Sequence, residues 1–198
     1  MGIGNLFQMG KTRFIVTRLF VHLSGSGATP LLGVLNRAAR DAIAADGDLD
    51  TLGEGLATIC QSLLQYRDFW KSAANEGDEY WDEGDASTAI EELFTDSAQR
   101  YLSELPPNLS TTSDDDLLTL PPTGNLVVML TVAYEGEVPD LETNLADLEA
   151  LEYGLKALIS LHYNQKLRAI QVHFSPAQLG DELTDDQLLQ NFPELIPL

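Results

Sequence analysis

The segment Leu126–Val132 constrains the fold more than any other part of the sequence. It reads LVVMLTV, and Thr131 is its single polar residue. A strand without alternating polar positions has to be covered on both of its faces, as a central strand of a sheet is. The sequence therefore predicts that Leu126–Val132 is a central strand and the most buried strand of the protein.

The residues that follow predict a strand–helix–strand unit. Asp140–His162 has leucines at helical spacing, and Leu167–Phe174 alternates apolar with more polar positions, as a strand with one buried face does. A capping box that begins at Thr184 predicts a short last helix. Because two strands are too few to be stable alone, a third has to come from Leu117–Leu120, from the N-terminal half or from another subunit.

The N-terminal half is predicted to be mostly helical. Residues 6–23 have the spacing of an amphipathic helix, with Lys11 and Arg18 on one side and apolar residues on the other. Further helices are expected over Thr29–Ala45, Leu49–Trp70 and Ser87–Ser103, with a turn-rich acidic segment over Asn75–Asp85. The expected fold class is α+β, a mostly helical N-terminal half followed by a strand–helix–strand unit with a small sheet and a short C-terminal helix.

These elements suggest four regions. Residues 105–124 have four prolines, clustered serines and threonines and three adjacent aspartates, which is typical of a linker. The expected organisation is a basic amphipathic arm (1–27), a helical region (28–104), the linker (105–124) and a strand–helix–strand region (125–198).

Composition excludes several classes of protein. The 198 residues include 31 acidic and 11 basic side chains, which gives a net charge of −20 and disfavours nucleic acid as a partner. Cys60 is the single cysteine, so no internal disulfide framework exists, and a reducing compartment fits this usage. No apolar run reaches the length of a membrane-spanning helix. We therefore expect a cytoplasmic protein.

The charge is unevenly distributed, and this marks candidate interaction surfaces. The first 40 residues contain five basic and no acidic side chains, whereas Asn75–Glu104 contains ten acidic ones. The basic arm can pack on the acidic body, lie on anionic lipid with weak affinity, or dock a partner protein. Aromatic residues in a polar setting are typical of interfaces. The candidate surface residues are Lys11, Arg13 and Arg18 in the arm and Tyr80, Trp81 and Asp82 in the acidic segment.

No motif predicts catalysis, a cofactor or a metal. Gly4–Thr12 resembles a phosphate-binding loop but has the wrong glycine spacing and no preceding strand. A calcium loop starting at Asp78 lacks the required glycine and ligand positions. The three histidines (His22, His162 and His173) are not at metal-ligand spacing, and no histidine near Cys60 in the sequence would activate its thiol. We expect no catalytic, cofactor-binding or metal-ligating residues.

Several segments resemble a known family, the one called domain of unknown function 1517. The resemblance rests on Asn125–Val128, Leu167–Val172, Phe174–Pro176 and the C-terminal Asn191–Leu198, with its aromatic–proline–acid–leucine order, and extends to Leu49–Trp70. The family occurs in cyanobacteria and chloroplasts, so the resemblance implies a photosynthetic cell and a role near the photosynthetic apparatus. It has no established activity, and the resemblance therefore implies no functional residues.

Two hypotheses of different classes follow. The first is a non-enzymatic accessory or regulatory protein that acts through protein contacts, is cytoplasmic or peripheral to thylakoids, and has an unidentified protein partner. Such a protein is also free to form a homo-oligomer. The second is a small-molecule-binding or enzymatic domain with a site between the helical half and the strand pair. A deep pocket with convergent polar groups would favour the second hypothesis.

Overall fold

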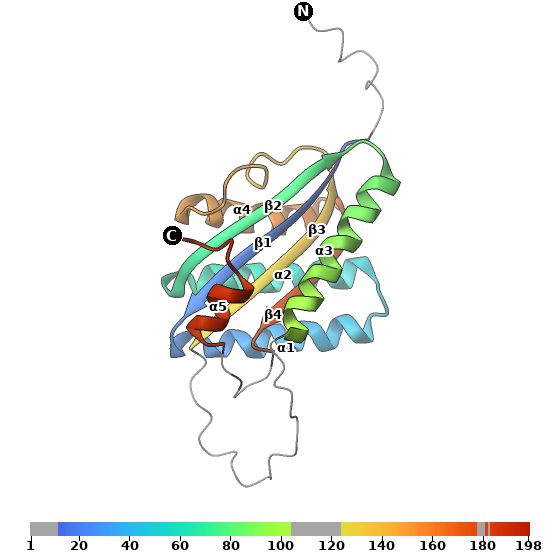
Figure 1. Ribbon diagram of the computed structural model, residues 1–198. Helices are drawn as coiled ribbons and strands as arrows, with labels where there is room; N and C mark the ends of the chain where they lie inside the picture. The colour runs from blue at the N-terminus through green and yellow to red at the C-terminus, as the bar shows by residue number, and fades with distance from the viewer. Residues whose placement is uncertain (1–11, 104–123, 178–180, 182) are drawn as a thin grey trace, which may run out of the picture.

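The computed structural model describes residues 12–103, 124–177, 181 and 183–198. In these ranges the chain forms a five-stranded sheet with the order β4-β3-β1-β2-β5, and every neighbouring pair is antiparallel (Figure 1). The strands are β1 (Phe14–Ser24), β2 (Trp70–Tyr80), β3 (Asn125–Glu135), β4 (Leu167–Ser175) and β5 (Ile196–Pro197). The α-helices are α1 (Thr29–Ala44), α2 (Leu49–Gln65), α3 (Glu83–Ser103), α4 (Leu148–Tyr163) and α5 (Asp185–Asn191).

The α+β class is confirmed, but the mostly helical N-terminal half is wrong. Residues 14–23 of the predicted amphipathic helix lie instead in β1, which pairs with both β2 and β3 in the middle of the sheet. The third strand required by the strand–helix–strand unit therefore comes from the N-terminal half. Leu117–Leu120 and most of the predicted linker 105–124 lie outside the described residues.

The burial of β1 explains why its pattern is misleading. All of Phe14–Leu23 is buried, so both faces of the strand are covered and its apolar residues do not alternate with exposed ones. Arg18 and His22, which suggest a polar helix side, are buried polar residues with partners inside the protein. The β-branched residues Ile15, Val16, Thr17 and Val21 favour the strand.

The acidic segment predicted as a turn forms the outer half of β2. The strand continues to Tyr80, and α2 ends at Gln65 rather than at Trp70. Helix α3 begins at Glu83, four residues earlier than predicted. Strand β2 pairs with β1 along its length, whereas β5 pairs with it only at Ser72 and Ala73. In the described part of the chain the outer half of β2 is therefore a sheet edge, and it carries the polar and charged side chains typical of one.

Helices cover both faces of the sheet (Figure 1). On one side, here the α2 face, α1, α2 and α4 enclose the main core, to which β1 contributes Ile15, Leu19 and Val21. On the other side, the α3 face, α3 and α5 pack on two smaller clusters that contain Val16 and Phe20. Two helical layers are what a continuously apolar central strand needs.

The C-terminal predictions are confirmed in outline. Val128 and Leu130 of β3 are fully buried, as expected of the central strand. The capping box forms between Thr184 and Gln187 at the start of α5. Helix α4 starts at Leu148 rather than at Asp140, because the side chain of Asp147 caps it there.

Candidate functional site

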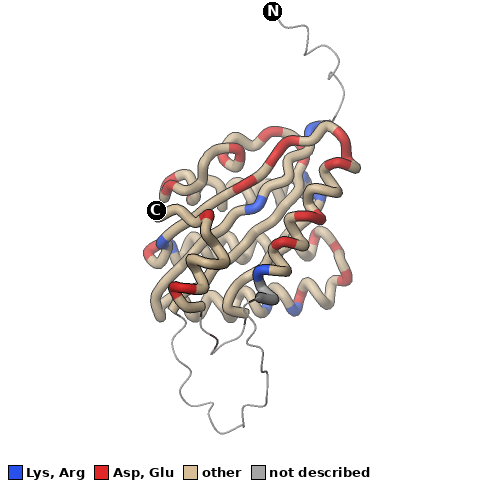
Figure 2. Tube along the Cα trace, in the orientation of Figure 1, with Lys and Arg blue, Asp and Glu red and all other residues tan. Residues whose placement is uncertain are grey.

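The sheet has two edges, and they differ in charge. The outer half of β2 carries Glu76, Asp78 and Glu79, and acidic residues follow this strand and the neighbouring α3 (Figure 2). Strand β4 pairs with β3 on one side and, in the described part of the chain, with no strand on the other. Its residues Ala169–Phe174 carry no acidic, lysine or arginine side chain. Charged side chains prevent an edge from pairing with another chain, so the β4 edge lacks a protection that β2 has.

Helix α1 lies on the same side of the molecule as this edge. It packs mainly on α2 and on the 3-10 turn Ser26–Ala28. Its first half is anchored by the buried Leu31, Leu32 and Leu35. Its second half has no buried residue, and Ile43 is 82% exposed. The end of α1 therefore extends away from the core.

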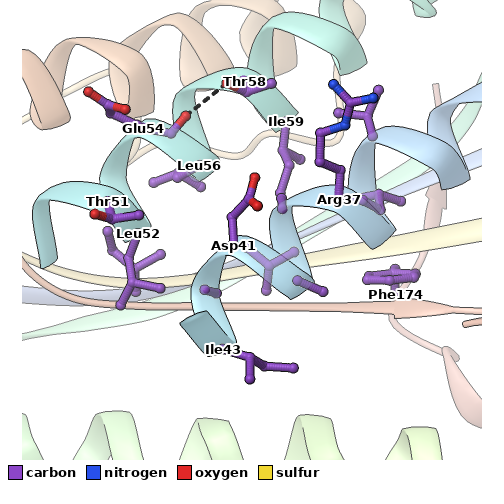
Figure 3. A pocket seen from close by; sticks show the side chains of 18 of the residues that line it. Arg37, Asp41, Ile43, Thr51, Leu52, Glu54, Leu56, Thr58, Ile59 and Phe174 are labelled. Atoms are coloured by element: carbon purple, nitrogen blue, oxygen red, sulfur yellow. Dashed lines mark hydrogen bonds between the residues drawn. The ribbon is translucent and has the colours of Figure 1, made fainter. Parts of the chain in front are cut away.

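A groove of about 970 Å³ lies between α1, α2 and β4 (Figure 3). It is mostly apolar: α1 contributes Val34 and Ala38, α2 contributes Leu56 and Ile59, and β4 contributes Ile170, Val172 and Phe174. The side chains of these three β4 residues are half-buried, so they present apolar surface to the groove. Such a volume is typical of a binding site.

Small residues on the two helices give the groove its width. A Cβ atom added at Gly33 would meet no atom within 4 Å, and one added at Gly55 would lie 3.9 Å from the Cβ of Ala38. Glycine inside a helix costs about 1 kcal/mol relative to alanine. Helix packing does not require the missing side chain at Gly33, whereas a larger residue there would project into the groove.

The charged groups of the groove lie at its rim. Arg37, Asp41 and Glu54 are exposed and, within the described part of the chain, take part in no ion pair. Further carboxylates stand in the turn between α1 and α2, at Asp46, Asp48 and Asp50. The titratable side chains of the groove lining are Arg37, Asp41 and Glu54, and all three are exposed. The groove can therefore bind an apolar ligand and attract positive charge at its rim.

The three histidines and Cys60 are not among the residues that line the groove. His22 Nδ1 is 2.8 Å from Ser72 Oγ, and its Nε2 is 3.1 Å from Asn125 Oδ1. Burial lowers the pKa of His22 despite the hydrogen bond with Asn125. Burial also raises the pKa of the Cys60 thiol, which lies in the main core. Among the described residues, no group of three or more His, Cys, Asp or Glu side chains could hold a metal ion.

The structure separates the six predicted surface residues. Lys11 lies outside the described residues. Arg13 donates to Glu79 (2.9 Å) and to Glu142 (2.7 Å) at the end of the sheet where β2 reaches Tyr80. Tyr80 and Trp81 are half-buried there, and Asp82 accepts a hydrogen bond from the backbone N–H of Gly84 near the start of α3. Arg18 lies in the interior, 2% exposed, and is not accessible to a partner.

Arg18 instead joins β1 to β2 and α3. Its guanidinium donates to Glu76, to Asp96 Oδ2 (2.6 Å) and to Ser97 Oγ (2.8 Å), and it lies over the ring of Phe20. Arg100 also donates to Asp96 (2.8 Å). Burial opposes the ionisation of Asp96, but its two arginine partners hold the pKa of this carboxyl below its usual value. The α3 face is thus held by an ionic network as well as by apolar contacts.

Further buried polar side chains lie on the α3 face of β3 and β4. Within the described ranges, Thr131 Oγ1, Gln171 Oε1, His173 Nδ1 and Ser175 Oγ have no hydrogen-bond partner. The strand register aligns Arg18, Thr131 and Gln171 across β1, β3 and β4. These side chains form a polar layer on the α3 face of β3 and β4.

The groove residues were not among the sequence candidates. The alternation of Ile170, Val172 and Phe174 predicted one apolar face of β4, but nothing in it shows that β4 is an edge strand. Gly33 and Gly55 indicate helices of reduced stability, because glycine lowers helix propensity. They do not indicate a groove unless the sheet order and the position of α1 are known.

No helix in the described part of the chain combines the length and the apolar character needed to cross a membrane. The described residues define a small α+β protein with a five-stranded antiparallel sheet and an apolar cleft beside the β4 edge, where Ala169–Phe174 carry no acidic, lysine or arginine side chain. The family "Protein of unknown function (DUF1517)" matches residues 13–198, and the chain belongs to this family. Comparison with curated proteins and with solved structures gives no match.

Proposed function

We propose that this protein is a non-enzymatic accessory or regulatory protein that acts through protein contacts, and that the groove between α1, α2 and β4 is its docking site. One observation carries this proposal: the unprotected edge of β4 opens onto the groove, whereas the β2 edge carries carboxylates. Unpaired strand edges bind extended segments of other proteins through backbone hydrogen bonds. The docked partner is therefore a segment of another protein with apolar side chains.

The lining of the groove favours this function over the enzymatic or small-molecule alternative. A small-molecule site usually places a few polar groups where they converge on the ligand. Here the polar side chains Arg37, Asp41 and Glu54 are exposed at the rim, and the interior is apolar. An apolar cleft beside a strand edge offers shape and backbone hydrogen bonds, which suit a polypeptide.

The cellular setting is part of the proposal. The sequence motifs resemble a family of photosynthetic organisms, and we place the protein in such a cell, in the cytoplasm or at the thylakoid surface. Membrane contact would be weak, because Arg18 is buried and Arg13 is paired with two carboxylates. Two of the three basic residues considered for lipid binding, Arg13 and Arg18, are thus paired with carboxylates of the same chain.

A pair of tryptophan variants tests the docking site. Gly33→Trp places an indole in the groove without a clash at Cβ, whereas Ala44→Trp adds the same side chain on the same helix outside the groove lining. The wild type and both variants are immobilised and exposed to a lysate of a photosynthetic host, and bound proteins are quantified by mass spectrometry.

The comparison between variants decides the outcome. We expect a set of proteins that the wild type and Ala44→Trp retain and that Gly33→Trp loses. Equal retention by all three proteins would contradict docking in the groove. A lipid or metabolite that co-purifies with the wild type and is displaced by Gly33→Trp, without any protein behaving in this way, would favour the small-molecule alternative.

A further inference from the structure

The relation between α1 and the sheet indicates what kind of segment docks. In a layered α/β structure, helices lie about 10 Å above the sheet, and neighbouring strands are spaced about 4.8 Å apart. Helix α2 packs over β4, whereas α1 packs mainly on α2. The first half of α1 joins the main core through Leu31, Leu32 and Leu35, and its second half has no buried residue. The groove lies between α1, α2 and β4, and among the described residues no strand pairs with the outer side of β4 (Figure 3). The sheet is thus one strand short on this side.

We propose that a partner segment adds to β4 as a sixth strand beneath α1, antiparallel to β4, with basic residues after its C-terminal end. This inference rests on the proposed function and specifies its binding mode. Every strand pair in the sheet is antiparallel, so an antiparallel neighbour continues the pattern already present. Strand β4 has nine residues, which is long enough to pair with a typical strand.

The apolar part of the segment follows from the register of β4. Ile170, Val172 and Phe174 face the groove and lie on the same face of the strand. Side chains of an added strand on this face would stand beside them and beneath Val34 and Ala38 of α1. The segment therefore carries apolar, β-branched residues at alternate positions.

The position of the basic residues follows from the carboxylates around the groove. Asp41 and Glu54 lie at its rim, and Asp46, Asp48 and Asp50 lie in the nearby α1–α2 turn. Phe174 lies at the opposite end of the groove from Thr51 and Leu52 (Figure 3). The α1–α2 turn therefore lies toward the N-terminal end of β4. The C-terminal end of an antiparallel segment reaches this turn, where positive charge is favoured.

A second copy of the same chain is a poorer occupant. Pairing β4 with β4 of another molecule would bring together two chains that each carry a charge of −20. It would also place no run of basic residues at the acidic turn, because Arg168 is the single Lys or Arg in β4 and is already paired with Glu135. Self-association is accordingly an outcome of the test.

The test uses synthetic peptides and the full chain. One peptide has about seven residues with valine alternating with threonine, followed by a short run of lysines. A second carries the same lysines before the apolar part. A third and a fourth are the first peptide with N-methyl groups on its odd-numbered or on its even-numbered backbone amides. Affinity is measured by titration calorimetry for the wild type, Gly33→Trp and Ala44→Trp, and amide hydrogen exchange is followed in residues 169–174.

We expect the peptide with C-terminal lysines to bind at least about fivefold more tightly than the reversed one, since several exposed ion pairs add small contributions. In one of the two N-methylated peptides the methyl groups lie on the amides that face β4, and this peptide should bind at least about tenfold more weakly. Binding should slow amide exchange in β4 of the wild type and of Ala44→Trp but not of Gly33→Trp.

Three results would overturn the inference. If both N-methylated peptides bind as tightly as the first peptide while Gly33→Trp still abolishes binding, strand addition is refuted and docking in the groove remains supported. Absence of measurable binding by all peptides would also refute it, while the lysate comparison would still decide the proposed function. Sedimentation of the free protein as a dimer that Gly33→Trp converts to a monomer would assign the edge to a second copy.

Discussion

The Arg18 network yields an asymmetric prediction for stability. The side chain of Arg18 is 3% exposed, whereas the side chains of Glu76 and Asp96 are 49% and 46% exposed. Removal of the carboxylates leaves a buried guanidinium with uncharged partners only, and removal of the arginine leaves two carboxylates that water can reach. We therefore expect Glu76→Gln combined with Asp96→Asn to destabilise the protein more than Arg18→Met.

The magnitudes follow from the burial of each group. Removing the partner of a buried charge costs about 3–5 kcal/mol, and we reduce this to about 2–3 kcal/mol because both carboxylates are half-exposed and the guanidinium keeps its bonds to Ser97 and the Leu93 carbonyl. Replacing a buried ion by an apolar residue is often neutral or stabilising. Arg18→Met also loses the contact with the Phe20 ring, worth about 0.5–1 kcal/mol, so its net effect should stay within about 1 kcal/mol.

Urea unfolding followed by circular dichroism measures both free energies of unfolding. The single variants Glu76→Gln and Asp96→Asn serve as controls, and each should fall between the wild type and the double variant. The opposite order would contradict the prediction: a loss of about 3 kcal/mol or more of the free energy of unfolding in Arg18→Met, with less than about 1 kcal/mol lost in the double variant. The arginine would then stabilise the fold by more than charge pairing.

Three further predictions concern packing, reactivity and pH. Gly53→Ala should destabilise the protein by about 1–3 kcal/mol, because its Cβ would lie 2.2 Å from Nδ1 of His162 where α2 meets α4. Gly33→Ala, whose Cβ would meet no atom within 4 Å, should stabilise it by up to about 1 kcal/mol. Equal effects of the two substitutions in thermal unfolding would contradict the packing argument. The Cys60 thiol, whose pKa is raised by burial, should react with a thiol reagent only after unfolding, and rapid labelling of the native protein would be inconsistent with its place in the core. The hydrogen bond from Arg13 lowers the pKa of Glu142 despite partial burial, so the ionised carboxylate stabilises the fold at pH values above its unfolded pKa. The free energy of unfolding should therefore decline as pH falls below about 4.5, and it should decline less in Glu142→Gln. An identical pH profile in that variant would refute the assignment.

The elements that could be predicted from the sequence are those whose signals are local or whose environment is simple. Thr29–Pro30 marks the start of α1, the Thr184 capping box marks α5, and the uninterrupted apolar run marks β3. Each of these signals depends on residues a few positions apart. The strand–helix–strand order of the C-terminal region follows from them.

The strands β1 and β2 could not be predicted in this way, because their patterns reflect distant partners. Arg18 suggests a solvated helix side, yet its charge is compensated by Glu76 and Asp96, far away in the sequence. The outer half of β2 is acidic because it is an edge strand, a property that depends on the order of the sheet. The groove was missed for the same reason, since it exists only where α1 extends beyond β4.

Crosslinking from the groove rim tests directly whether a partner protein docks there. A photoreactive phenylalanine analogue replaces Arg37, an exposed residue of the groove lining, and in a control protein it replaces the exposed Ser87 on α3. After irradiation in living cells of the source organism, crosslinked peptides are mapped by mass spectrometry. Docking in the groove predicts that position 37, and not position 87, joins to one short apolar segment of another protein, and that Gly33→Trp removes this product. Products from both positions that are alike, or that contain only lipid, would contradict it.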